Sequence, residues 1–183
     1  MSKKDLILDV AESLFNQFGY TAVGVDMIRD EAEVSKTSMY RHFGSKTKLI
    51  EAVLERRHQR FESSLEAALA SVSGSQSQLN ALLDWHFAWF EQPDFKGCMF
   101  MHALAEFKES DRDISALAKK HKYWLKQLLI RTIESTGVED YLVRSEMMMV
   151  FLEGLIVRSE FQSLESDKSY YHRTWFELSG FCK

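Results

Sequence analysis

The chain has 183 residues, of which 45% are hydrophobic and 27% charged, and its net charge is -4 at pH 7. This length allows one domain or two small ones with a real core, and the composition is that of an ordinary globular protein. Two cysteines are too few for a disulfide scaffold. No apolar run is long enough to span a membrane, and the acidic residues near the N-terminus argue against a signal peptide. We therefore expect a cytoplasmic protein without membrane contacts.

The sequence predicts an all-α fold, because eight glycines and one proline leave few breaks between helices. Apolar residues repeat at three- and four-residue spacing over residues 6–18 and predict a first helix that ends at Gly19. A short second helix is expected over residues 25–32. Ser35 can then cap a third helix that runs through Phe43.

Gly44 ends the third predicted helix, and Ser45 caps a fourth that extends to about residue 71. After a Ser-rich linker at residues 73–77, the apolar spacing predicts five more helices, including a seventh over 111–135 and an eighth over 139–164. No stretch alternates with the period of a strand. We therefore expect about nine helices: a helix-turn-helix domain over residues 1–47 and a helical bundle for ligand binding and dimerisation over 48–183.

The segment from Val34 to Ile50 contains no acidic residue but four cationic ones. A short cationic window with hydroxyl and aromatic side chains is typical of a surface that faces phosphates. The first turn of the third helix would enter a major groove, and Lys46 would hold a phosphate from the fourth helix. The predicted DNA contacts are Ser35, Lys36, Thr37, Ser38, Tyr40, Arg41, His42 and Lys46. The alternative is a solvated cationic face.

The same residues carry a resemblance to a known family. Residues 7–15, the aromatic-Gly-Tyr run at 18–20, residues 34–46 and Leu49 resemble the DNA-binding part of the TetR family of bacterial transcription regulators. The resemblance implies DNA contacts at the positions named above, dimerisation through the last two helices, and a ligand pocket inside the bundle of the fourth to eighth helices.

The sequence departs from the family pattern around the second helix. Val23 and Gly24 stand where a capping Thr or Ser is usual, Arg29 replaces an Ala, and Glu33 replaces the Gly of the turn. Glu33 is therefore expected to adopt a backbone geometry that costs about 1 kcal/mol more than it would for glycine.

The middle of the chain is rich in aromatic and methionine side chains beyond what one packing stripe requires. We expect them to line a pocket for an apolar or aromatic effector, although plain core is the alternative for each of them. The predicted ligand-binding residues are Phe61, Trp85, Trp89, Phe100, Met101, Phe107, Trp124 and Met148.

The eighth predicted helix is apolar on nearly all sides between Met147 and Val157. One face can pack on its own bundle and the opposite face on a two-fold partner, unless the helix is wholly buried in the monomer. The predicted dimer interface consists of Leu152, Leu155, Ile156, Ser159, Tyr171, Trp175 and Leu178.

No catalytic grouping or phosphate-binding glycine loop stands out, and we expect neither a metal site, a cofactor nor an enzymatic activity. The favoured hypothesis is a ligand-responsive transcriptional regulator, most simply a repressor, that binds a near-palindromic double-stranded operator as a homodimer and is released by a small molecule. The alternative is an all-α small-molecule-binding protein or enzyme without DNA binding.

Overall fold

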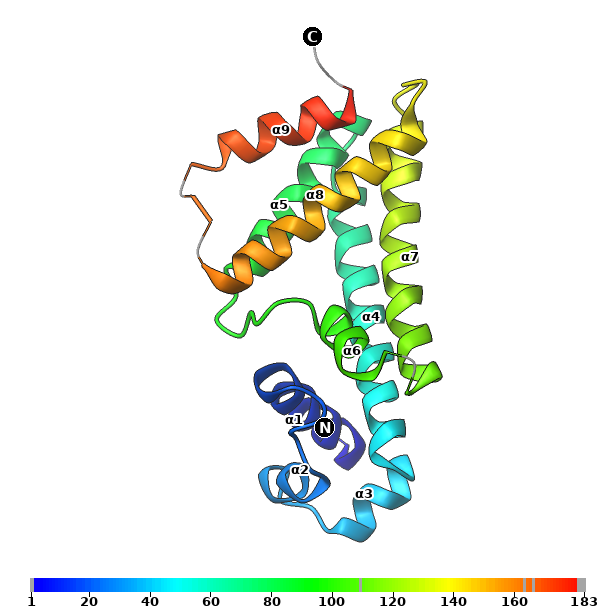
Figure 1. Ribbon diagram of the computed structural model, residues 1–183, viewed down its shortest axis with the longest axis vertical. Coiled ribbons are helices and arrows are strands. Elements are labelled where there is room, and N and C mark those ends of the chain that lie inside the picture. The colour runs from blue at the N-terminus through cyan, green and yellow to red at the C-terminus, as the bar shows by residue number, and fades with distance from the viewer. Residues whose placement is uncertain (1, 109, 163, 166, 181–183) are drawn as a thin grey trace. The chain divides into compact units, whose positions relative to one another are not determined.

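The computed structural model describes residues 2–108, 110–162, 164–165 and 167–180 of the chain. These residues form helices and no strand, so the predicted all-α class is confirmed (Figure 1). The helices are α1 (Lys3–Phe18), α2 (Val25–Glu31), α3 (Lys36–Phe43), α4 (Lys46–Ala70), α5 (Ser75–Phe90), α6 (Met99–Phe107), α7 (Arg112–Glu134), α8 (Tyr141–Phe161) and α9 (Ser169–Ser179). No helix among the described residues is both long and apolar enough to cross a membrane.

The chain divides into two compact units that do not follow the predicted boundary at residue 47. The first unit comprises residues 1–60 and 98–121, and the second comprises residues 61–97 and 122–183. Helices α4 and α7 contribute to both units. The separate functions assigned to residues 1–47 and 48–183 remain a prediction.

The core of the first unit forms where α1 packs on α4 and α6. The apolar stripe of α1 buries Ile7, Ala11 and Phe15, as its spacing predicts. Tyr20 follows the helix and is fully buried, and its hydroxyl donates a 2.9 Å hydrogen bond to the carbonyl of Met99 at the start of α6. Burial raises the pKa of this phenol, so it stays protonated and remains a donor.

A buried carboxylate fixes α1 against α4. Glu12 is 7% exposed and accepts hydrogen bonds from Arg56 at 3.0 Å, from Arg57 at 2.8 Å and from Arg60. Burial alone would raise the pKa of Glu12, but the guanidinium groups of Arg57 and Arg60 lower it further than burial raises it. The carboxylate is therefore ionised at neutral pH and ties two successive turns of α4 to one point on α1.

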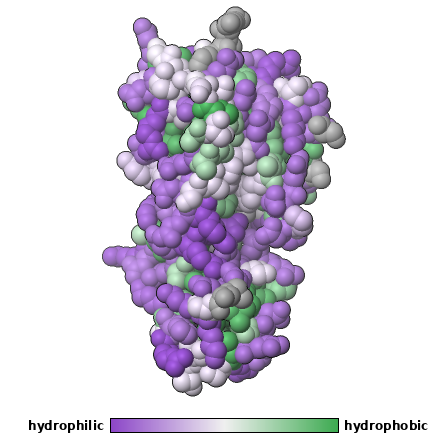
Figure 2. Space-filling view, turned by 180° about the vertical axis from the view of Figure 1, so that it is seen from behind, coloured by the Kyte–Doolittle hydropathy of each residue, from purple (hydrophilic) through white to green (hydrophobic). Residues whose placement is uncertain are grey.

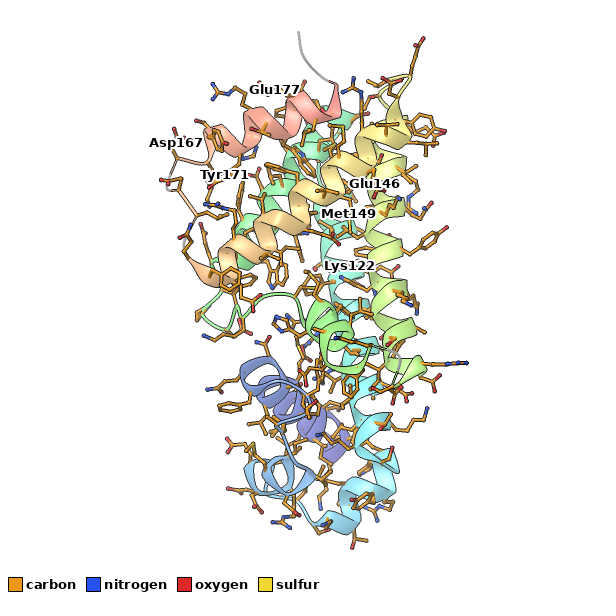
Figure 3. All side chains as sticks on the ribbon, in the orientation of Figure 1. Lys122, Glu146, Met149, Asp167, Tyr171 and Glu177 are labelled. Carbon is orange, nitrogen blue, oxygen red and sulfur yellow. The ribbon has the colours of Figure 1, made fainter. Side chains whose placement is uncertain are left out.

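The core of the second unit is built from α5, α8 and α9 together with the C-terminal halves of α4 and α7, which contribute residues 65–69 and 125–133. Trp175 of α9 is fully buried, and its indole N–H donates a 2.9 Å hydrogen bond to the carbonyl of Leu79 in α5. Tyr171 of α9 and Met149 of α8 belong to the same buried cluster (Figure 3). On the outside, hydrophilic residues predominate and hydrophobic ones form separate patches in the face shown in Figure 2.

Candidate nucleic-acid interface

The turn between α2 and α3 has the geometry of a tight helix-turn-helix connection. Glu33 adopts φ 51°, the left-handed conformation that the glycine of such a turn normally supplies. The side chain of Ser35 then accepts a 3.1 Å hydrogen bond from the Ser38 N–H and caps α3, as predicted. The two helices are thus set at an angle by one strained residue and one capping residue.

One face of α3 points away from the first unit. Lys36, Thr37, Tyr40 and Arg41 are all exposed, and their spacing places them on the same side of the helix. Tyr40 exposes 45% of its surface, which is high for an aromatic side chain. Arg41 forms no ion pair with any residue that the structure describes.

The other predicted contacts on α3 are less accessible. Ser35 is exposed at the helix cap, and His42 is half-buried. Ser38 is only 7% exposed and lies beside the buried Met39, so its side chain faces the interior of the unit. The accessible face of α3 is therefore narrower than the run of residues in the sequence.

Acidic residues of α2 partly neutralise this surface. The ammonium group of Lys36 lies 3.3 Å from a carboxylate oxygen of Asp26, and Arg29 lies 2.7 Å from the same residue. These pairs are exposed and therefore weak, so a phosphate oxygen can compete for Lys36. No local pattern in the sequence predicts this contact, because Asp26 and Lys36 are ten positions apart on different helices.

Lys46 lies at the first turn of α4 and points back toward the turn between α1 and α2. Its ammonium nitrogen is 3.4 Å from the carbonyl oxygen of Thr21, and burial lowers the pKa of Lys46. Glu106 of α6 accepts hydrogen bonds from the backbone N–H groups of Tyr20 at 2.9 Å and Thr21 at 2.6 Å. Glu106 thus holds the turn that Lys46 contacts, a role that no local sequence pattern reveals.

The predicted effector-binding residues are divided between the two units. Phe61, Trp85 and Trp89 meet in the second unit, with the Phe61 ring 5.1 Å from that of Trp85 and 4.9 Å from that of Trp89. Met148 is fully buried in the core of this unit, and Trp124 is partly buried against it.

The remaining three predicted effector residues belong to the first unit. Phe100 is buried and stacks on the His121 ring at 3.7 Å. Phe107 lies 5.8 Å from the Tyr20 ring, and Met101 is half-buried. Of the predicted effector residues, the structure thus brings together Phe61 of α4 with Trp85 and Trp89 of α5.

The predicted dimer residues lie mostly inside the chain's own core. Leu152, Leu155, Ile156, Tyr171 and Trp175 are each at most 5% exposed, and Ser159 and Leu178 are half-buried. The exposed apolar side chains of α8 lie on another face of the helix. This face presents Val143, Met147, Val150, Gly154 and Phe161 at intervals of three, four and seven residues.

Comparison with known proteins finds a match for the N-terminal helices and relatives of nearly the whole chain. Residues 7–53 match a family model described as bacterial regulatory proteins, tetR family. The transcriptional activator FasR of Mycolicibacterium smegmatis is 35% identical over 89 residues, which are 49% of this chain and 41% of FasR, so the match spans less than half of that relative. The probable transcriptional regulator YttP of Bacillus subtilis is 25% identical over 97% of this chain and 90% of its own.

Solved structures show the same fold over nearly the whole chain. SCO4454, a TetR-family transcriptional regulator from Streptomyces coelicolor, superimposes with a TM-score of 0.87 at 22% identity, covering 98% of this chain and 93% of its own. A putative TetR-type regulator from Streptomyces avermitilis gives a TM-score of 0.85 at 22% identity over 98% of this chain and 99% of its own. These likenesses confirm the predicted arrangement of N-terminal helix-turn-helix and C-terminal helical domain.

Proposed function

We propose that the chain is a DNA-binding transcriptional regulator, as its likeness to the TetR family supports, and that it acts as a homodimeric repressor that binds a near-palindromic operator and leaves it when a small apolar or aromatic effector binds. The observation that carries the proposal is the outward face of α3, with Lys36, Thr37, Tyr40 and Arg41 exposed on one side of a capped helix.

This face supports reading of a major groove. Thr37 lies in the first turn, where a short hydroxyl side chain can reach a base edge, and Arg41 lies one turn further along. Tyr40 and Lys36 are long enough to reach phosphate oxygens at the groove rim. Ser38, in contrast, supports the helix from inside, and we propose no base contact for it.

The exposed apolar stripe of α8 supports a dimer. Val143, Met147 and Val150 are between 50% and 63% exposed, and Phe161 is 81% exposed. A continuous row of exposed apolar side chains along a helix is costly unless another surface covers it. In a two-fold dimer the same row on a second copy supplies that cover, and two copies of α3 about 34–36 Å apart would read successive major grooves.

The aromatic group of Phe61, Trp85 and Trp89 supports an apolar or aromatic effector. The Phe61 ring packs edge to face against both Trp85 and Trp89, an arrangement that a flat aromatic ligand can extend. A thermal-shift screen of apolar and aromatic compounds tests this part, and a hit should also weaken operator binding by the wild-type protein.

The DNA-binding part is tested by fluorescence anisotropy with duplexes from the region upstream of the protein's own gene. We expect Thr37→Ala to alter the preference among operator variants, since each base contact is worth about 1–3 kcal/mol. Lys46→Ala should weaken binding to all duplexes similarly. It should also reduce the salt slope, which is the slope of the logarithm of the binding constant against the logarithm of the salt concentration, by about 1.

Thr174→Ala and Lys96→Ala are matched controls in the second unit and should leave both quantities unchanged. Failure of the wild-type protein to bind any upstream duplex, at low salt and without added compounds, would remove the basis of the proposal.

A further inference from the structure

A cationic hollow lies where α6 is joined to α7 in the first unit. It has a volume of about 390 Å³ and is lined by Lys108, Arg112, Ser115, Ala116 and Lys119. Lys108 follows the last residue of α6, Arg112 begins α7, and Lys119 lies two turns further along α7. Three cationic side chains thus surround one concave surface.

The charges of this hollow are not neutralised by the described part of the chain. Lys108, Arg112 and Lys119 are exposed, and none of them forms an ion pair with a described residue. The neighbouring Lys120, in contrast, pairs with Glu55 at 3.1 Å. Three cations held together without a counter-charge from the described residues repel one another, so an anion that binds among them is favoured.

The two carboxylates that flank Arg112 in the sequence are engaged elsewhere. Asp111 accepts a 3.1 Å hydrogen bond from the Ile114 N–H at the start of α7. Asp113 lies 3.6 Å from the ammonium group of Lys48 on α4. Neither residue lines the hollow.

The hollow is also fixed in shape by the backbone. Ser115 donates a hydrogen bond from its hydroxyl to the carbonyl oxygen of Lys108, which ties the end of α6 to α7. Lys108 adopts φ 45°, a conformation that is rare for a residue with a side chain. The position of Lys108 relative to Arg112 is therefore set by the junction.

We propose that this hollow binds the phosphate or diphosphate group of a small phosphorylated molecule. A guanidinium group can hold two oxygens of one phosphate, and two ammonium groups can neutralise the remaining charge. The hollow measures only about 390 Å³ and is lined by five residues, a size that favours a compact anion over the backbone of a duplex. This site is separate from the aromatic group proposed for an apolar effector.

The same junction connects the hollow to the DNA-binding helices within the first unit. Lys108 follows Glu106 by two residues, and Glu106 holds the N–H groups of Tyr20 and Thr21. An anion that draws Lys108 toward Arg112 would shift the end of α6 and thus this contact. The regulatory half of the inference rests on the proposed function, whereas anion binding itself does not.

Isothermal titration calorimetry of the full chain with inorganic pyrophosphate tests the site. We expect saturable binding by the wild-type protein and at least tenfold weaker binding by the double variant Lys108→Ala, Arg112→Ala. The matched control, Lys96→Ala with Arg173→Ala, removes one exposed lysine and one exposed arginine from the second unit. It should bind pyrophosphate as the wild type does.

Absence of saturable binding by the wild type, or an equal loss in both double variants, would overturn the site. Anisotropy measured with operator DNA, in the absence of pyrophosphate, tests whether these cations bind the phosphates of DNA instead. If the Lys108 and Arg112 variant weakens DNA binding and lowers its salt slope while pyrophosphate does not bind, the cations serve the duplex and the small-molecule site is wrong. If pyrophosphate binds but no DNA does, the proposed function fails and the site stands.

Discussion

Glu33 stores conformational strain in the turn between α2 and α3. Its φ of 51° costs a residue with a Cβ about 1–2 kcal/mol relative to the right-handed conformation. Glu33 also places an exposed negative charge three residues before Lys36 in the chain. The turn therefore retains its geometry against a local preference, which requires support from the helices on either side.

We expect Glu33→Gly to raise the free energy of unfolding by about 1 kcal/mol, because glycine adopts a positive φ without steric cost. Glu33→Ala removes the same charge but keeps the strain, and it should leave stability nearly unchanged. Urea denaturation of the three proteins measures the difference. Equal stabilisation by both variants would mean that charge, and not backbone strain, is responsible.

His86 makes the stability of the second unit sensitive to mild acid. Burial lowers the pKa of His86 to about 4 from an ordinary value near 6.5, and the nearby Lys122 adds to this, although the bond to the Leu82 carbonyl opposes it. Below pH 6.5 the unfolded chain binds a proton that the folded chain does not. Stability from this residue is therefore lost as the pH falls from 6.5 toward 4.

The wild-type protein should lose about 2 kcal/mol more stability than His86→Gln when the pH is lowered from 7 to 5. Glutamine can still donate to the Leu82 carbonyl but does not titrate. Urea denaturation at the two pH values gives the comparison. If both proteins lose the same free energy, His86 is not the group that titrates.

At the residue scale, the sequence predicted features that depend on neighbours in the chain. The cap by Ser35 follows from local helix-capping chemistry, the left-handed Glu33 follows from the family resemblance, and both are present. It did not predict the inward position of Ser38 or the pairing of Lys36 with Asp26, because these depend on how α3 packs against α2.

Among the helices, α6 has a structural role that its length of nine residues does not suggest. Its Glu106 joins it to the turn after α1, and a Cβ added at Gly19 would lie 2.9 Å from a carboxylate oxygen of Glu106. Gly19 is therefore needed for this close approach as well as for its own φ of 81°.

Replacement of Glu106 by alanine should expose the N–H groups of Tyr20 and Thr21 and lower stability by about 1–2 kcal/mol. Hydrogen exchange followed by NMR should show faster exchange at these two amides. Glu62→Ala, on the part of α4 in the second unit, is the control and should leave them protected. Unchanged protection in Glu106→Ala would show that the carboxylate does not hold the turn.

At the element scale, the apolar periodicity predicted the helices well. The seventh was expected over 111–135 and runs from Arg112 to Glu134, and the eighth was expected over 139–164 and runs from Tyr141 to Phe161. Periodicity did not show which apolar face of α8 turns inward, because both faces carry large side chains. Leu152 and Leu155 entered the core, and Val150 and Met147 remained outside.

For the whole molecule, the exposed stripe of α8 gives a direct test of assembly. Val150 is 62% exposed, so Val150→Arg should leave the monomer folded but prevent a second copy from covering the stripe. Sedimentation velocity should show a dimer for the wild type and a monomer for the variant. Tyr123→Arg, at a side chain of α7 that is 65% exposed, is the control and should stay dimeric.

A wild-type protein that sediments as a monomer at micromolar concentration would contradict the dimer and leave the stripe without a partner.

The sequence predicted the fold class and the family resemblance of this molecule, since both rest on local motifs. Its division into units 1–60 with 98–121 and 61–97 with 122–183 was not predictable, because each unit joins segments that are distant in the chain.

The connection between α3 and α4 consists of only Gly44 and Ser45. Gly44 adopts φ 75°, and the side chain of Ser45 accepts a 3.1 Å hydrogen bond from the Lys48 N–H, so the conformation of both residues is restricted. A helix of eight residues is about 12 Å long, and a swing of about 5° displaces its far end by about 1 Å. Since a hydrogen bond does not survive a stretch of about that size, a rotation of the first turn of α4 too small to disturb the core would be enough to break the base contact proposed for α3.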